Sequence, residues 1–429
     1  MSPRTLILKK DKEFSLLRGH PWIYREAVKE PPPDLAMGEE VILRSHKGFD
    51  LGCGYVDPDS PILVRRVEGA ANADLRARLC DRIAAAVALR RSLFDEKTTN
   101  AWRAINGEGD GIPGLVVDRY GTALSLQIYS LGLEPYLDII VTALRKALPE
   151  VTLIRRRDQV RRARTAAGSS HGHAFDPHSR LSKTNETSDR SRKTGKDQKN
   201  TEDHDALLLG RTMPPFVAFS ENGMKFRADL VGGQKTGFFL DQRDNRDLIR
   251  RVARGRRCAN VCGYTGAFTV AALAGGAKSC VTVDIAEPAL REAEKIIQLN
   301  GFAAAKHDFI TADMFKFLEN TKNGPYDLLI VDPPSMAKSR RDVPLALKAY
   351  TRLNRLAFSR VAPGGLLFTA SCSAQVGRDD FISAVTDALR STGRFARFLV
   401  ESHHAPDHPI AVGHPEGRYL HGLLIEVGP

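Results

Sequence analysis

The sequence predicts an α/β fold for the second half of the chain, with helices on both faces of a mostly parallel sheet. Three observations lead to this prediction. Short apolar runs alternate with helical segments from residue 225 to residue 429. A glycine-rich turn, Gly263-Tyr264-Thr265-Gly266, follows the first run. An acidic residue, Asp284, ends the second run, about 20 residues after the turn.

Each element of this half has its own signal. Strands are expected at residues 258–263, 279–284, 327–334 and 366–373, where apolar and β-branched residues dominate. Helices are expected at 264–276, 287–301 and 345–365, and each of them ends in glycine. The Asn300-Gly301 pair is a typical helix stop. Strands that alternate with helices in this way form right-handed crossovers within one parallel sheet.

The first half of the chain has a different texture. Over residues 1–75, short apolar runs are separated by turn residues, which predicts a small β-barrel-like module. A helix is expected at 73–95, where apolar residues recur every fourth position. Residues 105–130 contain a glycine-rich turn and two alternating runs, which predict a β-hairpin. A second helix is expected at 133–148.

Residues 155–205 interrupt this order. They hold 13 Lys and Arg against 8 Asp and Glu, and Phe175 is their only aromatic residue. Such a segment buries too little apolar surface to offset its ordering, so we expect a disordered basic and polar insertion. It carries +5 of the net charge of +12. Both a solvated insertion and a flexible arm that touches RNA are compatible with this composition.

Composition excludes several classes of protein. A chain of 429 residues with 42% hydrophobic residues is expected to form two or three globular domains. None of the six cysteines forms a paired CxxC arrangement, so neither a zinc site nor another metal site is predicted. No apolar run reaches about 18 residues and no signal peptide is evident, so we expect a cytoplasmic protein without a membrane partner.

Three strand ends point to a bound adenosyl group. Ligands of such sheets lie at the carboxyl ends of the strands. Gly263 follows the first strand, where a glycine turn brings backbone amides near a ligand. Asp284 is placed to accept hydrogen bonds from the two ribose hydroxyls, and Asp313 is placed to meet the adenine amino group. Each feature also has a plain structural explanation, as a strand–helix turn or as a helix N-cap.

Two further strand ends suggest what is modified. Asp332-Pro333-Pro334-Ser335 is a rigid turn with a carboxylate that suits a planar nucleobase, although it could be only a turn. Cys372, between Ser371 and Ser373, is where a nucleophilic thiolate would attack carbon 6 of a pyrimidine. A buried structural cysteine is the alternative. For Cys258, Cys262 and Cys280, packing is the better explanation.

Longer motifs resemble a known family. They include GGQKTGFFLDQRDNR at 232–246, NVCGYTGAFTVAALAGGA at 260–277, VDPPS, SCS, and in the first half SLLRGHPWIY at 15–24. Together they resemble the ribosomal RNA large-subunit methyltransferase I type, a class I S-adenosylmethionine-dependent enzyme that makes 5-methylcytosine in large-subunit ribosomal RNA. The resemblance covers nearly the whole chain except about 155–205.

The resemblance implies a domain plan. A PUA-like RNA-binding domain would occupy residues 1–75 and a small α/β central domain 76–154. After the insertion, a Rossmann-like methyltransferase domain would occupy 206–429. Its seven-stranded sheet would end in an antiparallel hairpin formed by residues 394–404 and 419–428. The implied cofactor is S-adenosyl-L-methionine and the implied partner is large-subunit ribosomal RNA.

The resemblance also implies roles for single residues. The cofactor would be held by the set Phe238, Asp241, Arg243, Gly263, Tyr264, Asp284, Asp313 and Asp332. Cys372 would be the nucleophile, and Asp332 would orient the base. RNA would be contacted by Arg18, His20, Trp22, Arg65 and Arg66, although Trp22 could equally belong to the core of the small domain.

One departure keeps other functions open. The motif at Asp332 has no cysteine, unlike two-cysteine RNA cytosine methyltransferases, so the proton acceptor at carbon 5 is unassigned. Two alternatives remain, an RNA methyltransferase acting on a guanine nitrogen through the Asp-Pro-Pro turn, and a non-catalytic RNA-binding or ribosome-assembly protein. The oligomeric state is also open, with a homodimer among the alternatives.

Overall fold

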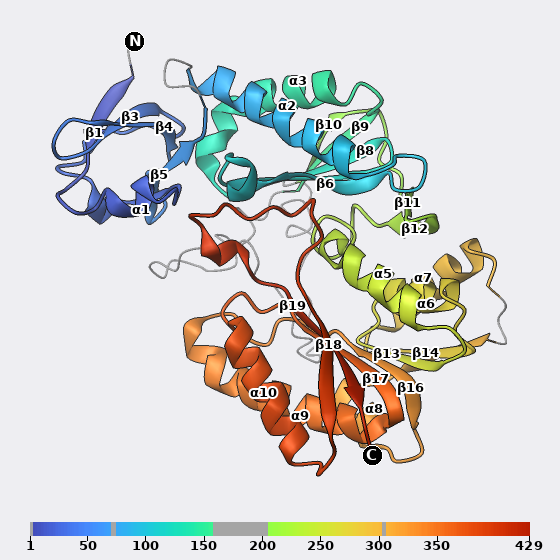
Figure 1. Ribbon diagram of the computed structural model, residues 1–429. Coiled ribbons are helices and arrows are strands. Elements are labelled where there is room, and N and C mark those ends of the chain that lie inside the picture. Colours follow the sequence, from blue (N-terminus) through green and yellow to red (C-terminus); the bar gives the residue numbers. More distant parts are fainter. Residues whose placement is uncertain (1–2, 70–73, 158–204, 303–305) are drawn as a thin grey trace, which may run out of the picture.

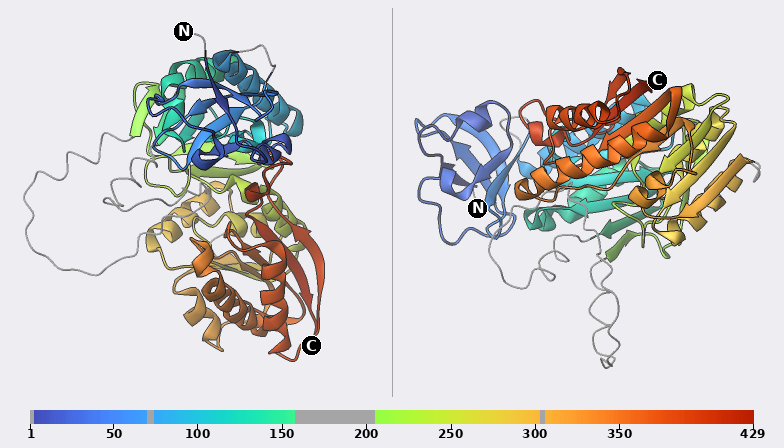
Figure 2. Two further views of the ribbon diagram at one scale, coloured as in Figure 1. Left: turned by 90° about the vertical axis from the view of Figure 1, so that its left-hand side faces the viewer. Right: turned by 90° about the horizontal axis from the view of Figure 1, so that it is seen from below.

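Three units follow one another along the chain, and each is built on its own β-sheet (Figure 1). The computed structural model describes residues 3–69, 74–157, 205–302 and 306–429. The N-terminal module lies at one end of the molecule, beside the central domain, as two further views show (Figure 2). No helix within these described ranges is long and apolar enough to cross a membrane.

The N-terminal module is the small β-rich unit that the turn-rich sequence predicts. Its sheet has the order β1-β3-β4-β5-β2. The elements are β1 (Arg4–Ile7), α1 (Phe14–Leu17), β2 (Trp22–Tyr24), η1 (Arg25–Ala27), β3 (Glu40–Arg44), β4 (Asp50–Val56) and β5 (Ile62–Val67). In β3, Val41 and Leu43 are fully buried while their neighbours are not, as expected for a strand with one face on a core.

The central domain packs two helices on a five-stranded sheet of order β10-β9-β8-β7-β6. Its elements are α2 (Leu75–Leu93), β6 (Ala101–Asn106), η2 (Gly107–Asp110), β7 (Leu115–Tyr120), β8 (Ala123–Ile128), η3 (Leu131–Tyr136), α3 (Leu137–Ala147), β9 (Leu153–Arg157) and β10 (Asp205–Leu209). The predicted hairpin is the antiparallel pair β7–β8, and both predicted helices are present.

The edges of the predicted insertion differ from the structure. Residues 155–157 belong to β9, and 206–209 lie in β10, which pairs antiparallel with β9 inside the central sheet. These positions were predicted as insertion and as methyltransferase domain. The three arginines at 155–157 favoured an insertion, but in the structure the Arg156 guanidinium pairs with Glu134 and Arg157 donates to the Gly233 carbonyl at 3.0 Å. The predicted disorder concerns residues 158–204, which lie outside the described part of the chain.

The third unit contains a seven-stranded sheet of order β15-β14-β13-β16-β17-β19-β18. Its strands are β13 (Arg257–Val261), β14 (Ser279–Asp284), β15 (His307–Thr311), β16 (Tyr326–Val331), β17 (Val361–Ser371), β18 (Ala396–Ser402) and β19 (His421–Val427). The first five are parallel, and β18 and β19 form the predicted antiparallel hairpin. A two-stranded sheet of β11 (Val217–Glu221) and β12 (Met224–Ala228) precedes it.

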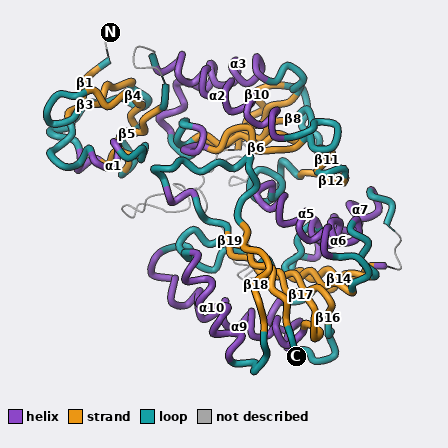
Figure 3. Tube along the Cα trace, in the orientation of Figure 1, coloured by secondary structure: helices purple, strands orange, loops and turns teal. Residues whose placement is uncertain are grey.

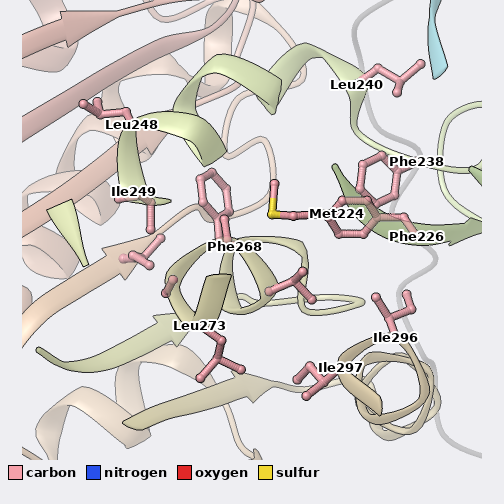
Figure 4. Packing of buried hydrophobic residues seen from close by; sticks show 14 of the residues in the cluster. Met224, Phe226, Phe238, Leu240, Leu248, Ile249, Phe268, Leu273, Ile296 and Ile297 are labelled. Carbon is pink, nitrogen blue, oxygen red and sulfur yellow. The ribbon is translucent and has the colours of Figure 1, made fainter. Parts of the chain in front are cut away.

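Helices cover both faces of this sheet. One layer contains η4 (Leu240–Gln242), α5 (Arg243–Val252), α6 (Ala267–Ala274) and α7 (Glu287–Leu299). The opposite layer contains α8 (Met314–Glu319), η6 (Arg340–Asp342), α9 (Val343–Arg360) and α10 (Arg378–Arg390). Figure 4 shows the first layer closing around Phe268, with Met224 and Phe226 reaching in from β12. The predicted doubly covered sheet is therefore present.

A long excursion joins the three units. Residues 403–420, between β18 and β19, leave the seven-stranded sheet and run along the central domain as a mostly irregular segment with one turn, η7 (Pro415–Gly417) (Figure 3). Asp407 Oδ2 accepts a 2.8 Å hydrogen bond from the Arg103 backbone amide, and the Asp407 carbonyl accepts one from the Arg90 guanidinium. Further along, Glu416 lies 3.5 Å from His20 of the N-terminal module.

Candidate active site

The strand register places the predicted site residues at one edge of the sheet. In the parallel pairs, Val261 lies opposite both Val283 and Val331, and Val331 lies opposite Thr369. The residues that follow these positions therefore emerge side by side at the carboxyl ends of the strands. This is the edge where ligands of such sheets bind.

The glycine turn after β13 is tightly built. The Gly263 amide donates to the Val283 carbonyl at 2.9 Å, and a Cβ on Gly263 would lie 2.6 Å from the Thr282 methyl carbon. Packing against β14 thus requires glycine here. Its neighbours Cys262 and Tyr264 both have a positive φ, of 60° and 47°. Such conformations are uncommon for residues other than glycine and are concentrated at functional sites.

Asp284 is held against this turn. Its Oδ2 accepts from the Tyr264 amide at 2.8 Å, and its Oδ1 accepts from the Ala286 amide at 2.9 Å. A carboxylate has about four acceptor positions, so two remain for other donors. The side chain is partly exposed, and the next residue, Ile285, is 72% exposed. Asp284 therefore offers a fixed, accessible carboxylate next to an exposed apolar surface.

Asp313 lies beside Asp284 and caps a helix. The Ala312 amide donates to the Asp284 main-chain carbonyl at 3.1 Å, which joins the two loops. Asp313 Oδ1 accepts from the Phe315 and Lys316 amides at 3.0 and 3.1 Å, at the N-terminus of α8. The capping role considered for Asp313 is thus present. The second oxygen, Oδ2, takes no part in this cap.

The segment 232–246 meets the glycine turn through Tyr264. The Gln234 amide donates to the Tyr264 hydroxyl at 3.2 Å, and the Phe239 ring lies 5.6 Å from the Tyr264 ring. Asp241 follows on the same segment. Its Oδ2 accepts from the Tyr419 hydroxyl at 2.7 Å and pairs with Lys235. This part of the motif therefore adjoins the predicted cofactor site.

Asp241 has a feature that points to a ligand. It is 2% exposed, and its Oδ1 is buried without a hydrogen-bond partner among the described residues. Burial raises the pKa of this carboxyl, but the charge of Lys235 and the hydrogen bonds from Lys235 and Tyr419 hold the pKa well below its usual range. A buried, ionised carboxylate oxygen that lacks a donor fits an ammonium group such as that of a methionine moiety.

Phe238 and Arg243 lie elsewhere. The Phe238 ring is buried 5.0 Å from Phe219, inside the core. Arg243 is 1% exposed, with Nη1 2.8 Å from Asp407 Oδ1 and Nη2 donating to the Ala101 carbonyl at 2.7 Å. The Arg243 side chain joins the third unit to the central domain, whereas the Phe238 ring packs within the third unit. In the structure these contacts, and not the site at the strand ends, occupy both side chains.

Cys372 and the Asp332 loop are in contact. The Cys372 thiol donates to the Pro333 carbonyl at 3.5 Å, and the cysteine is 5% exposed against Tyr419 and Leu420. Asp332 is partly exposed, and its amide donates to the Val261 carbonyl at 3.4 Å. The Cys372 thiol thus contacts the loop that begins with Asp332, next to the end of β13.

A third residue at this place was missed. The Tyr350 hydroxyl, on α9, accepts from Ser371 Oγ at 2.9 Å and lies 3.0 Å from Ser373 Oγ. Ser373 Oγ also accepts from the Met336 amide at 2.9 Å. The one signal in the sequence is a polar ring on the buried face of a helix, in line with Ala346 and Leu353.

The other cysteines of the sheet differ from Cys372. Cys258 and Cys280 are 1% exposed within the core, as predicted. Burial raises the pKa of the Cys280 thiol to about 12, so it stays protonated. Cys262 is partly exposed, and its thiol lies 3.4 Å from the Met314 sulfur.

The predicted RNA-binding residues are divided by the structure. Arg65 is 7% exposed, and its guanidinium donates to Ser130 at 3.0 Å in the central domain. The Trp22 indole donates to Glu108 at 2.9 Å, and its ring lies 4.6 Å from that of His414, near His20. Arg65, Trp22 and His20 thus take part in contacts between the N-terminal module and the rest of the chain. Arg18 is exposed, and Arg66 pairs with Glu68.

Comparison with known proteins agrees with this geometry. A family model described as S-adenosylmethionine-dependent methyltransferase matches residues 205–415, and one described as PUA-like domain matches residues 6–68. A putative S-adenosylmethionine-dependent methyltransferase structure from Streptococcus mutans has a TM-score of 0.77 at 22% identity, covering 99% of this chain and 100% of that one. This likeness extends to the whole fold, and the cofactor of the chain is S-adenosyl-L-methionine.

Curated relatives extend over the full length. The ribosomal RNA large subunit methyltransferase of Deinococcus radiodurans is 34% identical over 98% of this chain and 97% of its own. The ribosomal RNA large subunit methyltransferase I of Erwinia tasmaniensis is 33% identical over 98% and 99%, and that of Alteromonas mediterranea is 34% identical over 98% of both. With the PUA-like module, the seven-stranded sheet and the site at its edge, the chain therefore belongs to the ribosomal RNA large subunit methyltransferase I family of S-adenosylmethionine-dependent methyltransferases.

Proposed function

We propose that the chain methylates carbon 5 of a cytosine in large-subunit ribosomal RNA, with Cys372 as the nucleophile. The observation that carries this proposal is the Cys372 thiol at the Pro333 carbonyl, in the loop that begins with Asp332. A methyltransferase that acts on a nitrogen needs a carboxylate or carbonyl acceptor but no thiol. A thiol against the loop that would hold the base favours a reaction in which carbon 5 must first be made nucleophilic.

Cys372 would act by covalent catalysis. Its thiolate bonds to carbon 6 of the cytosine, which turns carbon 5 into an enamine-like nucleophile able to accept a methyl group. Loss of the carbon 5 proton to a base and breakage of the sulfur–carbon bond then restore the aromatic ring and the thiolate. The low exposure of Cys372 shields this adduct from water.

Asp332 would hold the base in place. A carboxylate at the start of the loop can accept a hydrogen bond from the exocyclic amino group of cytosine. The prolines at 333 and 334 fix the backbone that carries it. A target cytosine in structured RNA must leave its stack to reach this loop.

The described residues fit the cofactor. S-adenosyl-L-methionine supplies an electrophilic methyl group when bound. Asp284 would accept from its ribose hydroxyls, Asp313 Oδ2 from its adenine amino group, and Asp241 Oδ1 from its ammonium group, with the Gly263-Tyr264 turn between them. The exposed Ile285 would lie against the adenine ring.

The N-terminal module would contact RNA through a face that the sequence prediction missed. Phe14 and Phe49 are 55% and 67% exposed, on α1 and on the loop after β3. A 2.7 Å contact between Glu13 and His46 holds these two segments together. Exposed lysines lie near the two phenylalanines in the sequence, at positions 9, 10, 12 and 47. Aromatic rings among positive charges suit unstacked bases and phosphates.

The decisive experiment replaces Cys372 by serine. Large-subunit ribosomal RNA from cells that lack the protein is incubated with the purified variant, digested and measured by nucleoside mass spectrometry. We expect 5-methylcytidine with the native chain and none with Cys372→Ser. Cys80→Ser, a partly exposed thiol on α2, is the matched control and should keep full activity.

A covalent trap gives a second readout. In RNA that carries 5-fluorocytosine, carbon 5 cannot lose its substituent as a cation, so the adduct with Cys372 should persist on a denaturing gel. Full activity of Cys372→Ser would overturn the nucleophile. Methylguanosine as the product would replace the proposal by a nitrogen methyltransferase.

A further inference from the structure

A buried chain of three hydroxyl groups lies behind the Cys372 thiol. Ser371, Tyr350 and Ser373 are all 0% exposed. Ser371 Oγ donates to the Tyr350 hydroxyl at 2.9 Å, so the Tyr350 proton can point to Ser373 Oγ at 3.0 Å. The two serines are the immediate neighbours of Cys372. Tyr350 therefore connects the residues on both sides of the thiol to helix α9.

The same chain reaches the loop that begins with Asp332. Ser373 Oγ accepts from the Met336 amide at 2.9 Å and lies 3.2 Å from Ser335 Oγ. Together with the Cys372–Pro333 contact, these bonds join the end of β17 to residues 333–336 at several points. The distance between the Cys372 thiol and the Asp332 carboxylate thus depends on the hydrogen bonds that Tyr350 makes with the two serines.

The Tyr350 hydroxyl does not ionise at ordinary pH. Burial raises the pKa of its hydroxyl well above the usual range, and the nearby Cys372 raises it further. The neutral phenol is a permanent donor and acceptor. Its ring packs edge-on against Phe381 at 5.3 Å, so the ring has a packing role separate from that of the hydroxyl.

We propose that Tyr350 is a positioning residue, whose hydroxyl holds Cys372 and the Asp332 loop at the separation that the reaction requires. The proposal rests on the function proposed above, because it assigns Tyr350 to the step in which the thiol meets the base. Three buried hydroxyls that bridge two loops form a cooperative unit, so the loss of one should displace the others.

The test is Tyr350→Phe, which removes the hydroxyl and keeps the ring. Under saturating RNA and S-adenosyl-L-methionine, we expect methyl transfer to slow by roughly 10- to 100-fold, since a small misplacement of reacting groups costs about this much. The cofactor Kd and the KM for RNA should change by less than about threefold, because the ground-state contacts are unaltered. Formation of the 5-fluorocytosine adduct should slow in parallel with turnover.

The matched control is Tyr326→Phe. Tyr326 is a partly buried tyrosine at the start of β16, at the end of the strand far from Asp332. It should leave turnover and adduct formation unchanged. Ser373→Ala provides a second variant, and the combination with Tyr350→Phe should be less damaging than the product of the single effects, as for residues that act as one unit.

The outcomes separate the two proposals. Turnover within about twofold of the native rate for Tyr350→Phe, with Cys372→Ser inactive, overturns the positioning role alone. Weaker cofactor binding and a lower Tm in proportion to the lost rate would also overturn it, since they indicate a general structural role. Full activity of Cys372→Ser overturns the proposed nucleophile, whatever Tyr350→Phe does.

Discussion

At the residue scale, the acidic strand ends were the most predictable features. Asp284 follows an apolar run at a spacing that implies its position, and its carboxylate lies against the glycine turn as expected. Asp313 and Cys372 also occupy the predicted edge. Local sequence suffices here, because the register of a parallel sheet brings successive strand ends to one line.

Residues whose roles depend on distant partners could not be predicted. Arg243 belongs to a specific motif, yet its guanidinium donates to Ala101, 142 positions away. Arg65 resembled a surface arginine and is buried against Ser130. Tyr350 acquires its hydrogen bonds only when α9 meets the end of β17. No periodicity in one sequence reports such contacts.

Asp284→Ala should weaken cofactor binding. The lost hydrogen bonds from two hydroxyls to a charged group are worth about 1.5–3 kcal/mol, so the Kd for S-adenosyl-L-methionine should rise by roughly 10- to 100-fold. Isothermal titration calorimetry measures this change. Asp308→Ala, an exposed carboxylate on the adjacent β15, is the control. An unchanged Kd for Asp284→Ala would remove the carboxylate from the cofactor site.

At the element scale, the order of strands and helices was predictable and their limits were not. The Pro363-Gly364-Gly365 sequence predicted the end of a helix at residue 365 and a strand from 366. Instead β17 begins at Val361, which pairs with Tyr326, while Leu366 pairs with Leu328 across an irregular register. A neighbouring strand can thus extend pairing through residues with a strong turn signal. Strand β9 likewise extends into the arginines at 155–157, which were predicted as part of the insertion.

The RNA-binding face proposed for the N-terminal module gives a prediction for α1 and the loop after β3. A Lys12→Ala/Lys47→Ala variant should bind RNA more weakly, because two phosphate contacts are lost. The slope of log affinity against log salt should fall by roughly one for each lysine. Fluorescence anisotropy with a ribosomal RNA fragment at several salt concentrations measures both quantities.

A distant lysine serves as the control. Lys278, exposed at the start of β14 and far from the strand ends, should tolerate alanine without a change in slope. If the variants at 12 and 47 keep the native slope while Arg18→Ala reduces it, the RNA face lies on the side of α1 that leads to the central domain.

At the scale of the whole molecule, the excursion at 403–420 holds the units together. A single residue, Asp407, contacts Arg243 of the methyltransferase unit and both Arg103 and Arg90 of the central domain. The family resemblance implied a hairpin of residues 394–404 and 419–428. It could not show that the connection of this hairpin leaves the sheet, because the partners of Asp407 lie far away in the chain.

The histidines of this excursion should make the folded chain less stable at mildly acidic pH. Burial lowers the pKa of His404 to about 3, and burial also lowers the pKa of His408 and of His414. The folded chain keeps these rings neutral, while the unfolded chain binds protons below about pH 6.5. Stability is therefore fully present above pH 6.5 and falls as the pH drops toward 5, by up to about 1.4 kcal/mol per pH unit for each histidine.

The measurement is the Tm across this pH range. His404→Gln keeps an acceptor for the Leu420 amide but does not titrate, so its Tm should fall less steeply with acid than that of the native chain. Asp407, whose pKa is lowered, affects stability only below about pH 4. This is outside the pH range of the measurement. Parallel pH profiles for the variant and the native chain would exclude His404 as a contributor.

The pairing of β9 with β10 has a consequence for how the chain can vary in length. Arg157 and Asp205 lie opposite each other on the outermost two strands of the central sheet. Anything between them starts and finishes at adjacent points, remote in sequence from every candidate catalytic residue. Each doubling of a flexible connection costs only about 0.6 kcal/mol, so this position is a permissive one. A reporter, an affinity tag or a second binding module could be inserted between β9 and β10. The native connection could also be shortened, because the pairing of β9 with β10 does not require it.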